Sequence, residues 1–205
     1  MIIVSLGCAD SGAGAAGGAG AAGSGGVGPA GGGGSTTDGG GGSGGQTPFV
    51  LTSSAYEEGA TIPTEHECGP PVTDGPGDNV SPPLSWTPGP PGTQSYAIVM
   101  HDRDFMNLVH WVIYDVPSDV LSLPANIPRE YEPASVPSAK QAEIQGVFYG
   151  YLGPCSPNSV NTYEITVHAL SVPALSGVDQ NTPENEIAPL IEGMALASAS
   201  LSGES

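Results

Sequence analysis

Basic side chains are nearly absent from this sequence. Its 205 residues include 3 lysines and arginines against 21 aspartates and glutamates, a formal net charge of −18 with histidine neutral. Nucleic acid is therefore a poor partner, because its binding needs cations that replace the counterions of the phosphate backbone. A peripheral electrostatic hold on anionic lipid is not expected either, on the same ground. The charge instead favours solubility outside the cytoplasm.

Large side chains are missing from residues 9–46, which consist almost entirely of glycine, alanine and serine. Such a segment has nothing to bury and is typical of a flexible coil. The composition becomes ordinary from about Thr47 onward, and the remainder is long enough to bury one core. We therefore predict a disordered Gly-rich linker over 9–47 and a single globular domain over 48–205. No run approaches the ~20 apolar residues that span a bilayer.

Cysteine is also scarce, with only three in the chain. The first of them ends MIIVSLGC, residues 1–8, which resembles part of a bacterial lipoprotein signal. This stretch is short and has no positive charge before it, so we expect the true signal to be longer. Cys8 is then a lipid attachment site that tethers the domain to the cell envelope, in the periplasm or outer membrane. The alternative is a secreted protein in which Cys8 has no role.

The two remaining cysteines, Cys68 and Cys155, lie in loops rich in proline and glycine. In an oxidising compartment such a pair forms a disulfide, which we predict here. The alternative is two free thiols.

Short apolar runs separated by Pro/Gly loops predict a mainly β domain. Alternation over 162–170 places Tyr163 and Ile165 on one face and Glu164 and His168 on the other. The runs 96–100 and 109–116 are apolar at both parities, as strands buried on both faces are. Further strands are expected at 49–53, 84–86 and 144–152.

One helix is expected near the C-terminus. Thr182 is its predicted N-cap, Pro183 suits the first helical position, and Pro189 is expected to kink it. Its apolar stripe comprises Ile187, Leu190, Ile191 and Met194. Residues 195–202 then alternate with a period of two and predict a final strand; continuation of the helix through the alanines is the alternative.

Residues 101–115, HDRDFMNLVHWVIYD, join two predicted strands through the short loop 103–108. A hairpin would bring Asp102, Asp104 and His110 together at one end of the sheet. A carboxylate beside an imidazole favours its protonated form, so these residues predict a small anion site. The alternative is a buried structural pair that fixes the hairpin.

A metal site that adds His101 to this group is not expected, because strand alternation points His101 away from Asp102. His66 lies in a polar loop and His168 on the polar face of its strand, and both are expected to be solvated.

Several motifs occur in the order and spacing of one known family. They are DNVSPPLSW at 78–86, DRD at 102–104, HWV at 110–112, GPCSP at 153–157, YEITVHAL at 163–170 and the closing LASASL at 196–201. Together they resemble the phosphatidylethanolamine-binding protein family, in its bacterial Raf-kinase-inhibitor-like branch, over about residues 48–203. The resemblance implies a Greek-key antiparallel β-sandwich with a few peripheral helices. It also implies a small pocket for phosphate-like anions or phosphorylated head groups.

Carried over by position, the resemblance implies a set of pocket residues: Asp102, Asp104, His110, Gly153, Pro154, Pro157, Asn161 and Tyr163. Two departures from the family pattern concern charge. Asn161 and Thr162 stand where the family has histidine and arginine, and Asn161 donates a neutral hydrogen bond, about half as strong as a charged one. Arg103 replaces a proline and would restore positive charge if its side chain turned inward.

These observations predict a non-enzymatic binding module for a small anionic or phosphorylated ligand, similar to a phospholipid head group, on a tethered extracytoplasmic lipoprotein. The alternative is a protein-interaction module that inhibits a protease or kinase, as the resemblance implies for some family members. We expect no cofactor, no metal and no membrane contact other than the lipid anchor. A hydrolase has little support, because Ser81 and Ser85 have no adjacent base.

Overall fold

A computed structural model describes residues 47–156 and 159–205. The predicted signal with Cys8, nearly all of the predicted linker, and Pro157 lie outside the described residues. Within the described part, no helix has both the length and the apolar character needed to cross a membrane.

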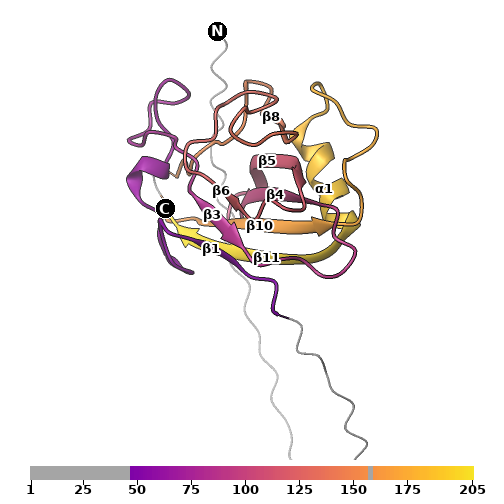
Figure 1. Cartoon of the computed structure of the whole chain (residues 1–205). Coiled ribbons are helices and arrows are strands. Elements are labelled where there is room, and N and C mark those ends of the chain that lie inside the picture. Colours follow the sequence, from indigo (N-terminus) through magenta and orange to yellow (C-terminus); the bar gives the residue numbers. More distant parts are fainter. Residues whose placement is uncertain (1–46, 157–158) are drawn as a thin grey trace, which may run out of the picture. The chain divides into compact units, whose positions relative to one another are not determined.

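The described residues form mainly β structure, as predicted (Figure 1). The strands are β1 (Leu51–Ser53), β2 (Ala60–Thr61), β3 (Leu84–Trp86), β4 (Ser95–Asp102), β5 (Leu108–Pro117), β6 (Ser122–Leu123), β7 (Lys140–Gln141), β8 (Glu143–Ile144), β9 (Phe148–Tyr149), β10 (Thr162–Leu170) and β11 (Ala195–Glu204). A 3-10 turn, η1 (Thr64–His66), and one helix, α1 (Glu184–Met194), complete the described elements.

The largest sheet has six strands in the order β2-β11-β10-β4-β5-β7. Its pairs are antiparallel except β11 with β2, which run parallel over two residues. All residues of β4 are buried, because β10 and β5 cover its edges and packed side chains cover both of its faces. This confirms the prediction of a strand without a solvent face.

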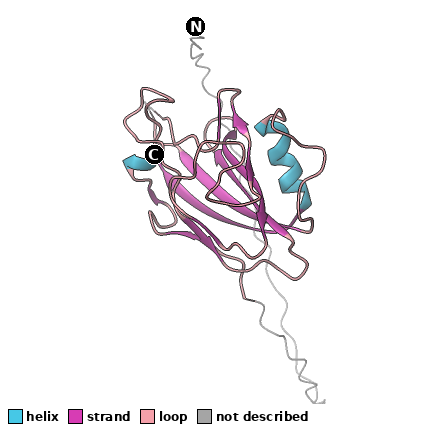
Figure 2. Ribbon diagram, turned by 45° about the horizontal axis from the view of Figure 1, so that its top comes forward, coloured by secondary structure: helices cyan, strands magenta, loops and turns pink. Residues whose placement is uncertain are grey.

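Two apolar cores lie on opposite faces of this sheet. On one face, Trp86 and Leu51 of the smaller sheet β1-β3-β6 pack with Ile98 and Ile165. On the other face, Ile187, Ala188 and Ile191 of α1 pack with Val99 and Val112. Figure 2 shows the helix standing against one side of the strands. The predicted sandwich is therefore present, with the helix as an additional outer layer.

The helix differs from its prediction at its N-cap and on its buried face. It begins at Glu184 with Pro183 as the N-cap, and Thr182 gives no side-chain cap because its Oγ1 accepts the N–H of Asp179 at 2.9 Å. Leu190 and Met194 of the predicted stripe are exposed, so the buried face consists of Ile187, Ala188 and Ile191.

Two strand predictions have different outcomes. The run 144–152 is not one strand: β8 and β9 pair with each other across a turn at Gln145–Val147. Gln145 and Gly146 have φ values of +53° and +66°, which an extended strand does not contain. The final strand is confirmed, since β11 follows α1 directly and pairs with β10 along its whole length.

Candidate functional site

Three adjacent strands bring Asp102, His110 and Tyr163 together. Asp102 ends β4 and lies opposite Tyr163 of β10. His110 of β5 meets Tyr163 edge to face, with ring centroids 5.1 Å apart. The three side chains are buried, with exposed fractions of 3%, 2% and 1%. The predicted hairpin thus forms, with Asp102 and His110 buried and Asp104 exposed on its turn.

The carboxylate of Asp102 is already hydrogen-bonded. Its Oδ1 accepts the N–H groups of Asp104 and Phe105 at 3.0 and 2.9 Å, and its Oδ2 accepts the side-chain amide of Asn161 at 2.8 Å. Asp104 Oδ2 accepts the N–H of Thr162 at 2.6 Å. Both carboxylates therefore tie the β4–β5 turn to the start of β10, and the structural-pair alternative explains part of their role.

The expectation of a cationic His110 is corrected by the structure. Burial lowers the pKa of His110, and the Leu152 carbonyl, Asp102 and the Gly153 carbonyl only partly oppose that shift. The ring is therefore neutral at neutral pH. Its Nδ1 donates to the Leu152 carbonyl at 3.1 Å, which leaves Nε2 as an acceptor in the neutral tautomer.

The hydroxyl of Tyr163 links this cluster to the loop that follows Leu152. It shares a hydrogen bond with Ser156 Oγ at 2.7 Å and accepts the N–H of Cys155 at 3.2 Å. Burial raises the pKa of Tyr163, so the phenol stays protonated. The tyrosine predicted from the resemblance thus holds the loop as well as facing His110.

Gly153 fixes the same loop against the segment that precedes β3. Its N–H donates to Asn79 Oδ1 at 2.5 Å. A Cβ at this position would lie 2.4 Å from the His66 carbonyl oxygen and 2.6 Å from the Cys68 backbone nitrogen. No other residue fits there, because both neighbours are backbone atoms.

The predicted disulfide between Cys68 and Cys155 is present in the structure. Beside it, the N–H of Cys68 donates to the carbonyl of Pro154 at 2.9 Å. These two links join the loop after η1 to the loop that carries Gly153 and Pro154.

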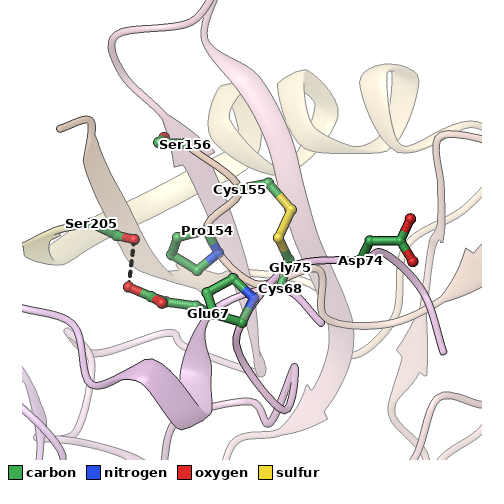
Figure 3. Close-up of a pocket in the computed structure, with 9 residues that line it drawn as sticks. Glu67, Cys68, Asp74, Gly75, Pro154, Cys155, Ser156 and Ser205 are labelled. Atoms are coloured by element: carbon green, nitrogen blue, oxygen red, sulfur yellow. Dashed lines mark hydrogen bonds between the residues drawn. A yellow bond between two sulfur atoms is a disulfide. The ribbon is translucent and has the colours of Figure 1, made fainter. Parts of the chain in front are cut away.

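A pocket of about 650 Å³ opens between these two loops (Figure 3). Its lining comprises Glu67, Cys68, Asp74, Gly75, Pro76, Pro154, Cys155, Ser156 and Ser205. In Figure 3 the disulfide lies between Asp74 on one side and the hydrogen-bonded Glu67 and Ser205 on the other. None of these described lining residues is basic, so the pocket wall is acidic. Ser156 joins it to the cluster, since the same side chain bonds Tyr163.

Arg103 does not supply the missing cation. Its guanidinium binds Glu164 and also donates to Asn107 Oδ1 at 2.5 Å, at the surface of the turn. The carboxylates of Asp102 and Asp104 are therefore not balanced by an arginine.

Two histidines expected to be solvated are buried instead. His66 is 2% exposed and its Nδ1 donates to the Val80 carbonyl at 2.8 Å. His168 is 5% exposed and bonds Ser198 Oγ at 2.9 Å. The polar face of β10 is covered because α1 packs over that side of the sheet. Near it, His101 lies 3.7 Å from Glu192, and no group of metal-ligating residues forms in the described chain.

Asn79, Ser156 and Glu67 contribute to the site but were not predicted. Asn79 carried a sequence signal, because it lies in the motif DNVSPPLSW. In the structure it has a φ of +56°, a conformation that asparagine tolerates better than most residues. Glu67 and Ser156 carried none, because their contacts depend on the approach of distant loops.

A mainly β sandwich with a pocket between the two loops that the Cys68–Cys155 disulfide joins defines the class of this protein as a ligand-binding or interaction module. The sequence matches the family described as phosphatidylethanolamine-binding protein over residues 52–205. The chain belongs to this family.

Relatives of this chain come from archaea and bacteria. A UPF0098 protein from Methanothermobacter thermautotrophicus is 30% identical over 156 residues, 75% of this chain and 95% of that protein. UPF0098 protein YbcL of Escherichia coli is 27% identical, over 75% of this chain and 85% of that protein. The crystal structure of E. coli YbcL, described as a member of the mammalian PEBP family, superposes with a TM-score of 0.68 at 25% identity, covering 76% of this chain and 96% of that one.

Proposed function

We propose that this chain is a non-enzymatic binding module for a small phosphorylated ligand that also carries an ammonium group, similar to a phospholipid head group. One observation carries the proposal. The Asp102–His110–Tyr163 cluster is joined through Ser156 to a pocket of about 650 Å³. That volume lies in the range of small-molecule sites.

The electrostatics favour a zwitterion over a bare anion. Glu67 and Asp74 line the pocket, and an ammonium group would be attracted to their carboxylates. The donors available to a phosphate are the neutral amide of Asn161 and the neutral hydroxyl of Ser156, whereas Nε2 of His110 can donate only after the ring is protonated. Because neutral donors bind a phosphate more weakly than cations do, we expect modest affinity.

His110 makes the proposed binding dependent on pH. Burial lowers the pKa of His110 in the free protein, and an anion beside the ring would raise that pKa. Binding of a phosphate monoester would then take up a proton. Affinity is expected to increase as the pH falls from 7 toward 5.5.

Titration of the full chain with phosphoethanolamine, phosphate and ethanolamine, followed by NMR, tests the proposal. We expect shifts at His110, Asn161 and Tyr163 at about millimolar ligand, with phosphoethanolamine binding tighter than either fragment. Tyr163→Phe should weaken binding. Tyr149→Phe is the matched control, because its hydroxyl bonds the Gln180 carbonyl at 3.1 Å outside the site. Absence of shifts, or equal effects of both variants, contradicts the proposal, and turnover of ester substrates would contradict the non-enzymatic part.

Attachment to the cell envelope through Cys8 is part of the same proposal. The disulfide supports an oxidising compartment outside the cytoplasm. Metabolic labelling with a radioactive fatty acid should mark the wild-type chain and not Cys8→Ser. Equal labelling of both would exclude this anchor, and release of the wild-type chain into the medium would favour the secreted alternative.

The alternative, a protein-interaction module that inhibits a protease or kinase, is favoured by one observation. Phe105 and Met106 are 55% and 88% exposed at the β4–β5 turn beside the cluster. Two neighbouring exposed apolar side chains at one turn would be available for contact with a partner. Inhibition that persists in His110→Ala while phosphoethanolamine binding is lost would assign the function to this surface.

A further inference from the structure

The outer edge of β11 is open over most of its length. β2 pairs only with Gly203 and Glu204 at its end. The rest of that edge therefore has no partner strand among the described residues.

The backbone direction along this edge follows from Ser202. Its N–H donates to Glu58 Oε2 at 2.8 Å and its carbonyl accepts the N–H of Gly59 at 3.0 Å, so both groups point away from β10. In an antiparallel strand, the backbone N–H and carbonyl groups of every second residue point toward the same edge. The backbone groups of Ser200 and Ser198 therefore point away from β10 as well. Within the described chain, no group bonds to the backbone of these two residues.

This edge lacks the features that normally prevent strand addition. Residues 195–202, ALASASLS, contain no charge and no proline. The opposite edge of the sheet is different, because β7 has only two residues and one of them is Lys140. Small side chains along β11 also let another backbone approach closely.

Two hollows line the open edge. One of about 320 Å³ lies between Leu196 and the rings of Phe49, Pro88 and Pro90. The other, of about 450 Å³, lies between Ser200 and the chain at 50–53 and also contacts Glu57 and Glu58. The edge is therefore flanked by an apolar hollow at the Leu196 end and by a hollow that contains two carboxylates at the Ser200 end.

We propose that the edge of β11 from Leu196 to Ser200 binds an extended basic segment of a partner protein as an added strand. Its main chain would bond Ser198 and Ser200, and an apolar side chain would enter the hollow beside Leu196. Charge complementarity selects the partner, because the chain has a formal net charge of −18 and the hollow beside Ser200 contains Glu57 and Glu58. A second copy of this chain would bring the same negative charge and be repelled.

The test uses the full chain and a fluorescein-labelled probe peptide of alternating lysine and valine. Anisotropy should show binding that weakens with salt, and hydrogen exchange should show the amides of Ser198 and Ser200 becoming protected. Ser198→Pro removes one outward donor and should weaken binding at least about tenfold, since an edge position tolerates proline. Ser198→Ala is the matched control, because both variants lose the hydroxyl that bonds His168 but only proline loses the N–H.

A peptide N-methylated on alternate residues tests the same bonds from the ligand side if Ser198→Pro does not fold. It should bind at least about tenfold more weakly than the unmodified probe, as should a glutamate–valine peptide. No binding of the lysine–valine probe at about 1 mM, or equal binding by Ser198→Pro and Ser198→Ala, overturns the proposal. A dimer in sedimentation that Ser198→Pro dissolves would overturn the basic partner and identify a second copy as the occupant.

Discussion

Replacement of Gly153 by alanine should destabilise the fold and loosen the site together. The added Cβ would meet the His66 carbonyl oxygen at 2.4 Å and the Cys68 backbone nitrogen at 2.6 Å, and neither backbone atom can move aside as a side chain would. Overpacking of this kind costs about 1–3 kcal/mol. Displacement of the loop also weakens the Gly153–Asn79 hydrogen bond, worth about 1 kcal/mol.

The expected loss is therefore about 3 kcal/mol of unfolding free energy, or roughly 6–12 °C in melting temperature for a domain of this size. Urea unfolding followed by tryptophan fluorescence measures it. Gly193→Ala is the matched control, because nothing lies within 4 Å of its Cβ position in α1 and alanine favours the helix by about 0.5–1 kcal/mol. A Gly153→Ala protein within about 0.5 kcal/mol of wild type, the usual limit for a benign substitution, would refute the reasoning.

Two further predictions concern stability. Replacing Cys68 and Cys155 by serine opens a link between residues 87 apart in sequence and should cost about 4 kcal/mol, measured by urea unfolding; unchanged stability under reductant would show that the link contributes nothing. Burial lowers the pKa of both His101 and His168 to about 4, below their unfolded value of 6.5, so the unfolded chain binds more protons between these values. Stability should therefore be complete above pH 6.5 and fall as the pH drops toward 4, less steeply in His168→Gln. The negative charges of Glu164 and Glu192 near His101 oppose this loss of stability, and the positive charge of Arg103 adds to it. A stability that does not change with pH in the wild type would contradict the assigned burial.

The positions of the long strands could be predicted because their patterns are local. The segments that form β4 and β5 are apolar at both parities, and the segment that forms β10 alternates between apolar and polar residues. Both patterns are typical of strands in a buried sheet. The hairpin followed from the short loop between β4 and β5, which is why Asp102 and His110 lie where the sequence placed them. The family motifs added Tyr163 and Gly153, whose partners in the strand order are not evident from spacing.

The errors arose where a distant element changed the environment of a residue. His168 alternates with apolar residues as a solvent-facing side chain would, yet α1 packs over that face and buries it. His110 lies beside a carboxylate, as predicted, but burial outweighs that charge and keeps the ring neutral. The sequence did not indicate which way the side chain of Arg103 points. In the structure its ion pair with Glu164, on the neighbouring strand β10, holds it at the surface.

The sequence by itself determined the mainly β domain, its order of strands along the chain and its acidic character, because these depend on local periodicity and composition. Only the tertiary structure decided that the pocket is bounded by Glu67 and Asp74, that Ser156 links it to Tyr163, and that β11 ends the sheet with an open edge. Those features depend on the approach of loops and strands that are far apart in sequence, and packing fixes that approach.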